Sequence, residues 1–281
     1  MMDTTFDNNL STVSRRVIPL VAVVAVLLVM GLYSVTDSLY LEHDPALGAA
    51  DYVGYSVCHR ITDRSFTIAG RQLPLCARCT GMYLGVSLTF AILLLAGRRR
   101  WSYLPPLRVM LVLLGFIALL AIDGINSYSH FFPKLPHAYE PQNWLRLLTG
   151  LGAGLAMGVI LFPALSQTLW RNQLHRPAVA NLRELLGLVL LALLVAALVL
   201  SDQPTILYVL GLVSAAGVLI VLTAINTTAI LILSRRDARA TRIREALAPL
   251  AIGLLLAAIQ VAVISILRFS ATGMMAGFPG I

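Results

Sequence analysis

The chain has 281 residues, of which 58% are hydrophobic and only 12% are charged, and its mean hydropathy is +0.84. These values exclude an ordinary soluble domain of this size and indicate an integral membrane protein. The formal net charge of +8 lies largely in arginine runs beside apolar stretches, so it indicates membrane topology and anionic lipid head groups as partners, not nucleic acid.

Seven apolar runs are long enough to cross a bilayer as helices, which takes roughly 17 to 25 residues each. They cover residues 17–41, 79–97, 104–125, 144–169, 184–200, 206–233 and 247–268. The predicted fold class is therefore all-α, a polytopic membrane bundle of about seven helices with a small outer loop that contains the cysteines. The fifth run is the shortest, and a six-span alternative stays open there.

The distribution of basic residues predicts the orientation, because positively charged loops stay in the cytoplasm. With the N-terminus inside, the cytoplasmic loops contain 14 of the 21 basic residues, and the C-terminus lies outside. Arg15 and Arg16 precede a run that is too long for a signal peptide, so we expect a retained first helix after a cytoplasmic tail of residues 1–16.

The segment after the first span predicts a short outer helix and a hairpin. Asp44 is a typical N-cap, and Pro45 would occupy the first position of a helix that runs to about Val57. Alternating residues around Ala69 and Gly70 then predict a small hairpin. This hairpin would fold the segment after it back toward the end of the outer helix.

Every cysteine of the chain lies in this outer region, in the sequence CHRITDRSFTIAGRQLPLCARCTG of residues 58–81. Cys58, Cys76 and Cys79 with His59 form a candidate tetrahedral zinc-type metal site. Alternatively, Cys76 and Cys79 at a helix N-terminus, with Cys58 as a further thiol, would suit thiol–disulfide exchange. A structural disulfide with one remaining thiol is the third interpretation.

A polar group is expected beside these cysteines. Ionisable residues at membrane depth are costly and are usually paired or functional. The third predicted span ends near Asp123 and Asn126, and the fourth presents Asn143 and Arg146 on one face. We expect Asp123 to pair with Arg146 or Arg78, which would join both groups into one site; Arg64 is a further supporting residue.

The second and fourth spans begin alike. Each has an arginine followed by Thr-Gly-x-x-x-Gly, at residues 78–85 and 146–154. Small residues four apart allow helices in lipid to approach closely. These two helices should therefore pack together and bring the cysteines beside Asn143 and Arg146.

The second half of the chain offers few polar residues within spans. They are Asn226, Thr227, Thr228 and Gln260, and they make a small-solute or ion transporter the third functional alternative. No nucleotide-binding or hydrolase motif occurs, so no nucleotide cofactor is expected. Thr80 stands where the haem-attachment motif requires histidine, so c-type haem is not expected either.

The segments CHR, LPLCARCTGMYLG, DGINSY and NWLRLLTGLGAG resemble an uncharacterised family of prokaryotic multi-pass membrane proteins, domain of unknown function 2085. The resemblance covers about residues 50–160 and implies the plasma (inner) membrane of a prokaryote, but no established activity. Family members often have a glutamine after the Asp-Gly pair, where this chain has Asn126 or Ser127.

We therefore divide the chain into the tail, a four-helix core of residues 17–170 with the outer loop, and a three-helix region of residues 171–281. The predicted function is an outer-face Cys3His site that binds zinc or another transition metal. A membrane thiol–disulfide oxidoreductase is the alternative. The sequence does not decide whether the protein is an enzyme, and it names no protein partner.

Overall fold

The structure is a computed structural model that describes residues 44–130, 132 and 138–274. The expected tail of residues 1–16 and the first expected span of residues 17–41 lie outside the described residues. Within them, six helices are long and apolar enough to cross a membrane. The polytopic all-α bundle is confirmed, including the short fifth span.

The six spanning helices follow the predicted runs to within a few residues. They are α4 (Ala77–Leu95), α5 (Leu107–Ser129), α6 (Asn143–Leu169), α7 (Leu182–Leu200), α8 (Pro204–Leu233) and α9 (Ile243–Thr272). The shorter elements are α3 (Pro45–Val57), η1 (Thr62–Arg64), β1 (Thr67–Ile68), β2 (Arg71–Gln72), β3 (Trp101–Tyr103) and β4 (Leu174–Pro177).

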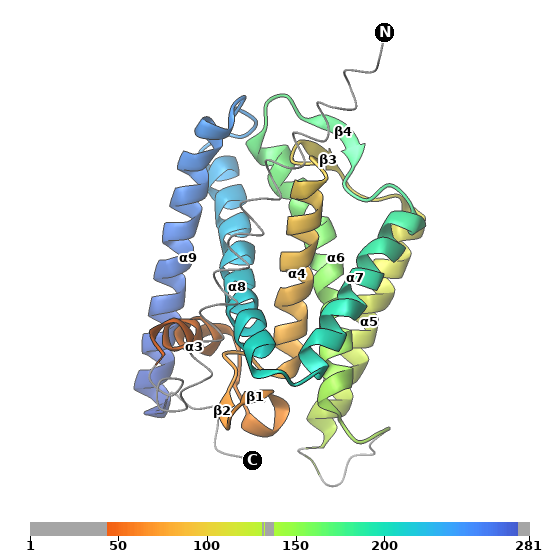
Figure 1. Ribbon diagram of the computed structural model, residues 1–281. Helices are drawn as coiled ribbons and strands as arrows, with labels where there is room; N and C mark the ends of the chain where they lie inside the picture. Colours follow the sequence, from red (N-terminus) through yellow and green to blue (C-terminus); the bar gives the residue numbers. More distant parts are fainter. Residues whose placement is uncertain (1–43, 131, 133–137, 275–281) are drawn as a thin grey trace.

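Helices α4 and α6 form the centre of the bundle (Figure 1). Helix α8 packs against both of them and against α9, while α5 and α7 lie on the opposite side of α6. The apolar faces of α5, α7 and α9 remain largely exposed in the protein, as expected for helices that face lipid. The most buried of the six spanning helices are thus α6, α4 and α8.

The two ends of the bundle differ in composition. At one end, which we call the cysteine end, α4 and α6 begin beside α3 and the hairpin of β1 and β2 (Figure 1). At the other, which we call the basic end, the parallel strands β3 and β4 join the loops after α4 and α6. Arg98 and Glu184 form an ion pair at the basic end.

The predicted outer helix and hairpin are confirmed. Asp44 caps α3 by accepting hydrogen bonds from the amides of Ala46 and Leu47 at 2.8 and 2.9 Å. The hairpin pairs Thr67 with Gln72, and Ala69 and Gly70 both have positive φ at its turn. This turn geometry matches the right-handed twist of paired strands, so it reverses the chain within two residues.

Candidate functional site

The end of α3 lies directly against the segment that precedes α4. A Cβ atom at Gly54 would lie 1.9 Å from the carbonyl oxygen of Pro74, so only glycine allows this approach. Because Gly54 is one turn before Cys58 and Pro74 is two residues before Cys76, the contact brings these cysteines together. The hairpin between them closes the loop.

The three cysteines form one compact group. The Sγ atoms of Cys58, Cys76 and Cys79 all lie within 4.8 Å of one another, and none of the three is in a disulfide. Cys58 is buried, and the other two are partly buried. The clustering that the sequence predicted is therefore present in the fold.

Two backbone amides point at the sulfur of Cys58. The amides of Cys76 and Arg60 donate to Cys58 Sγ at 3.3 and 3.5 Å. Arg60 has a positive φ of 54°, a conformation that a non-glycine residue adopts only at a cost, and its amide is one of these donors. Such donors stabilise negative charge on a sulfur atom.

His59 does not join the cysteine group. The backbone at Cys58 is extended, with φ −129° and ψ 144°, and successive side chains of an extended chain point in opposite directions. His59 is exposed, while the sulfur of Cys58 is buried. The structure thus assembles three sulfurs, and the imidazole that the sequence placed with them lies apart.

The hydrogen bond between the side chains of Cys58 and Cys76 shifts the pKa values of the two thiols in opposite directions. It raises the pKa of Cys58 to about 11. It also holds the pKa of Cys76 well below its ordinary value. Cys76 would therefore ionise first, with the Cys58 thiol as the donor to its thiolate.

The last two helices cover the cysteine group. Val218 and Leu222 of α8 pack with Cys58 and Leu75 in a small apolar cluster. Arg268 of α9 donates to the backbone carbonyls of Tyr55, Cys58 and His59. A cation placed at these terminal carbonyls of α3 is electrostatically favourable. Local sequence does not indicate this role, because Arg268 lies 210 positions after Cys58.

Helices α4 and α6 approach each other through the paired glycines, as predicted. A Cβ atom at Gly81 would lie 2.3 Å from the carbonyl oxygen of Leu147, and one at Gly150 would lie 2.2 Å from that of Arg78. Gly154 is equally tight against Met82, at 2.1 Å. These contacts are backbone to backbone, so they set the separation of the two helices.

Asp123 pairs with Arg78, one of its two predicted partners. Arg78 Nε donates to Asp123 Oδ2 at 3.0 Å, and its Nη2 atom donates to the same oxygen. The hydroxyl of Tyr139 donates to Asp123 Oδ1 at 3.0 Å. The Asp123 side chain is only 2% exposed, so each of its oxygens is satisfied by protein.

Arg146 has a different set of partners. Its Nη1 donates to Asn143 Oδ1 at 2.8 Å, and its Nε and Nη2 donate to the hydroxyl of Ser127 at 3.3 and 3.2 Å. Arg64 also donates to the carbonyl of Ser127, at 3.5 Å. Ser127 thus accepts hydrogen bonds from two arginines, through its hydroxyl and its carbonyl.

Asn126 fixes the start of the segment after α5. Its Nδ2 donates to the carbonyl of Tyr139 at 2.8 Å, and its Oδ1 accepts from the amide of Ala138 at 2.9 Å. Tyr139 is thus held where its hydroxyl meets Asp123. Nothing in the sequence marked Tyr139, since it lies in a loop without a motif.

Three arginines stand close enough to the cysteines to interact electrostatically with Cys76, namely Arg64, Arg78 and Arg146. With Asp123 they form a group that we call the arginine cluster, and Asp63 lies near Arg64, so among the described residues the three arginines exceed the two carboxylates by one positive charge. Of the other predicted supporting residues, Asn143 bonds to Arg146, and Asn126 acts through Tyr139, whose hydroxyl donates to Asp123. An excess of positive charge favours thiolates or a bound anion next to it.

The polar residues of the second half bond between helices. Asn226 and Gln260 exchange side-chain hydrogen bonds of 2.9 and 3.3 Å across α8 and α9. Thr227 donates to the carbonyl of Pro249 at 3.4 Å, and Thr168 donates to Thr228 at 3.5 Å. These contacts give the residues a role in packing the helices.

The cysteines and the arginine cluster belong to a stretch of the chain that is similar to known sequences. A family model described as predicted membrane protein, domain of unknown function 2085, matches residues 58–160. An uncharacterized protein of Methanothermobacter thermautotrophicus is 35% identical over 104 residues, which is 37% of this chain and 83% of the relative. The chain belongs to this family.

A second relative from the archaea is an uncharacterized protein of Methanocaldococcus jannaschii, 28% identical over 122 residues, which is 43% of this chain and 72% of the relative. No solved structure matches the chain. The family match begins at Cys58 and ends within α6, so it contains the cysteines and the arginine cluster but not α8 or α9. The family is one of membrane proteins, as predicted, and its description adds no activity.

Proposed function

We propose that the cysteine end binds a thiophilic transition metal ion, with zinc as the first candidate, through Cys58, Cys76 and Cys79. The observation that carries the proposal is the convergence of three free sulfurs within 4.8 Å. Zinc lies about 2.3 Å from each thiolate, so tetrahedral ligands are about 3.8 Å apart. Small side-chain rotations would bring the three sulfurs to these distances.

The surroundings of the sulfurs support a charged metal–thiolate group. Three thiolates with a divalent ion leave one negative charge, and the arginine cluster with the neighbouring Asp63 has one positive charge in excess beside it. Amides donate to Cys58 Sγ. Both features stabilise thiolates, which are the form that binds metal.

A site with three protein ligands differs from a structural zinc site. Structural sites have four protein ligands, whereas sites that handle water, substrate or another ligand keep one position open. With His59 pointing away, the fourth position would be available to an exchangeable ligand. We therefore favour a metal-handling role over a purely structural one.

The test is metal analysis of the purified protein. We expect about one zinc per chain, lost in the Cys58→Ser, Cys76→Ser and Cys79→Ser variants. His59→Ala is the matched control and should keep its metal; loss of metal in this variant would restore the Cys3His set. A wild-type protein that binds no metal after reconstitution under reducing conditions, while its thiols react freely, would contradict the proposal.

A thiol–disulfide oxidoreductase is the second candidate, and one observation favours it. Cys76 lies at the N-terminus of α4, and the hydrogen bond from Cys58 keeps its pKa well below the ordinary value. A thiolate of that kind attacks disulfides readily. Reversible formation of a disulfide within the group, measured by thiol-specific gel shift in a metal-free preparation, would support this function in place of the first.

A further inference from the structure

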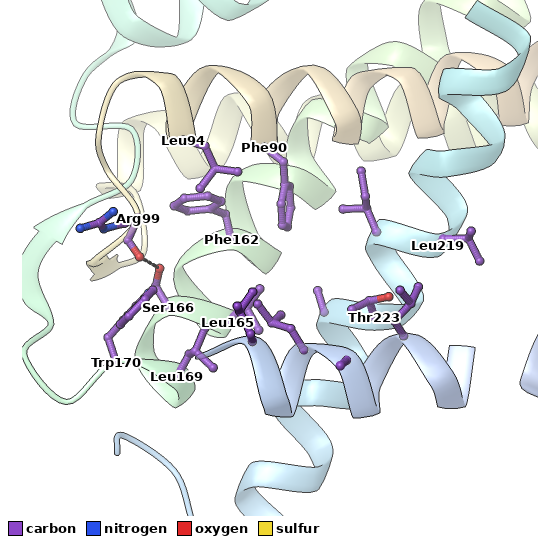
Figure 2. A pocket seen from close by; sticks show the side chains of 16 residues that line it. Phe90, Leu94, Arg99, Phe162, Leu165, Ser166, Leu169, Trp170, Leu219 and Thr223 are labelled. Carbon is purple, nitrogen blue, oxygen red and sulfur yellow. Dashed lines mark hydrogen bonds between the residues drawn. The ribbon is translucent and has the colours of Figure 1, made fainter. Parts of the chain in front are cut away.

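A cavity of about 600 Å³ lies between α4, α6, α8 and α9 in the half of the bundle toward the basic end (Figure 2). Its walls are almost entirely aliphatic and aromatic. Phe90 and Phe162 contact edge to face, with ring centroids 5.3 Å apart, and form part of one wall. Trp170 and Arg99 stand at the end of the cavity that meets the loops (Figure 2).

The depth of the cavity matches one leaflet of a bilayer. On α9 it reaches Leu254, and the helix begins at Ile243, so the difference is 254 − 243 = 11 residues. At 1.5 Å per residue this is about 16 Å. The hydrocarbon core of a bilayer is about 30 Å thick, so the cavity extends from the interface to about its centre.

The mouth of the cavity is strongly basic. A second hollow, lined by Arg99, Arg100, Thr241, Arg242, Ile243 and Arg244, shares Arg99 with the first. The guanidinium groups of Arg99 and Arg100 lie 6.0 and 5.5 Å from the ring of Trp170. Four arginines thus meet at the entrance to an apolar chamber.

Among the described residues that line this mouth or bond to its lining, one carboxylate occurs, that of Glu245. Glu245 accepts from the amide and hydroxyl of Thr241 at 2.6 and 2.9 Å and from the amide of Arg242 at 3.3 Å. It therefore satisfies the first amides of α9. Four arginines against one glutamate leave three positive charges in excess, so an anion at this point would be held by guanidinium groups.

We propose that this cavity binds one membrane phospholipid with an anionic head group, its acyl chains between the four helices and its phosphate among the arginines. A buried donor remains at the mouth for such a ligand. Arg100 Nε has no hydrogen-bond partner among the described residues. A phosphate oxygen is an acceptor that would lie at this position.

A segment of this chain is the alternative occupant of the cavity, and the positive charge of the rim favours the lipid over it. The apolar run of residues 17–41 follows Arg15 and Arg16, so its basic start would add two cations to a rim that already has an excess of positive charge. The basic rim and the depth of one leaflet both fit a phospholipid.

The experiment measures lipid binding to the full chain in detergent by native mass spectrometry, with added phosphatidylglycerol or phosphatidylcholine. We expect one phosphatidylglycerol to bind at least tenfold more tightly than phosphatidylcholine. The double variant Arg99→Gln with Arg244→Gln should weaken it roughly 30-fold, since each basic residue near a membrane surface contributes about a fivefold factor. The matched control, Arg108→Gln with Arg183→Gln, removes two exposed arginines outside the cavity and should change nothing.

Two further measurements decide the occupant. Ala251→Trp would fill the cavity without changing its charge, and it should also abolish the bound lipid. A photo-crosslinking residue at position 250 should label phosphatidylglycerol. Equal binding of both lipids, no difference between the two double variants, or crosslinks from position 250 to residues 17–41 would each overturn the proposal.

Discussion

The two ends of the helix bundle use arginine in different ways. At the cysteine end, Arg78 and Arg146 are held by hydrogen bonds to Asp123, Asn143 and Ser127. At the basic end, Arg242 and Arg244 are exposed around a hollow. The difference teaches that the same side chain organises a buried site where protein acceptors surround it and leaves its charge exposed where it lies on the surface.

Helix packing differs between the ends for a related reason. Near the cysteine end, glycines bring the backbones of α4 and α6 into contact. Toward the basic end, Phe90 of α4 and Phe162 of α6 meet edge to face on the wall of a cavity that opens between these two helices and α8 and α9. Close backbones support a fixed constellation of side chains, whereas separated helices leave room for a ligand. Four predictions compare the two ends.

The largest expected effect concerns which end faces outward. In a variant whose native cysteines are replaced by serine, a single cysteine at the exposed position Glu140 should react with a membrane-impermeant reagent in intact cells. A single cysteine at the exposed position Arg239 should react only after lysis. The reason is that the loops of the basic end contain the arginines that stay in the cytoplasm. Labelling of position 239 in intact cells would reverse the orientation.

The second prediction compares one ion pair from each end. Removal of one partner of a buried pair leaves an uncompensated charge and costs about 3–5 kcal/mol. Arg78→Ala should therefore lower the free energy of unfolding in detergent by about that amount, since Asp123 is 2% exposed. Arg98→Ala removes a pair whose partner Glu184 is 29% exposed, a bond to the carbonyl of Ala178 and a guanidinium 4.4 Å from the ring of Trp101, so it should cost less, about 1–2 kcal/mol. Equal losses would show that the two ends do not differ in this respect.

The third prediction compares two glycines. Gly150→Ala would place a Cβ atom 2.2 Å from a backbone oxygen of α4, and such overpacking costs about 1–3 kcal/mol. It should also weaken metal binding, because α4 positions Cys79. Gly187→Ala on α7 meets no atom within 4 Å among the described residues, so it should be neutral or stabilising by up to about 1 kcal/mol. Thermal unfolding of both variants, with the wild type, measures the difference.

The smallest effect is expected for two arginines that lie over aromatic rings. Arg268→Gln removes donors to three carbonyls and a guanidinium 4.1 Å from the ring of Tyr55, so it should cost about 1–2 kcal/mol. Arg176→Gln at the basic end removes only a contact at 6.0 Å from the ring of Trp101 and should stay within about 0.5 kcal/mol. A change in zinc affinity in the first variant alone would show that α9 supports the cysteine group.

Several features of the site follow from local sequence. Asp44 and Pro45 define the start of α3, and Ala69-Gly70 defines the hairpin turn. The repeated Thr-Gly-x-x-x-Gly correctly predicted which two helices approach each other. Helix caps, turns and rows of small residues depend on residues that are close together in the chain or on one face of a helix. They can therefore be predicted from the sequence alone.

Which of the polar side chains pair with one another depends on the fold. Asp123 could have paired with Arg146 or Arg78, and it pairs with Arg78, while Arg146 bonds to Ser127 and Asn143. The sequence gives only the depth of each residue in the membrane. Rotation of α5 relative to α4 and α6 decides which side chains meet, and that rotation results from packing over the whole helix.

The composition alone determined that the protein is a membrane bundle, because no other fold buries so many apolar residues with so few charges. The spacing of the cysteines made them candidates for one site. Only the tertiary structure separated His59 from them, since an extended backbone at Cys58 turns adjacent side chains to opposite sides. Likewise, only the tertiary structure showed that Arg268 bonds to the end of α3, that Tyr139 bonds to Asp123, and that a cavity opens toward the basic end. Contacts between distant segments depend on how the helices pack and leave no mark in local sequence.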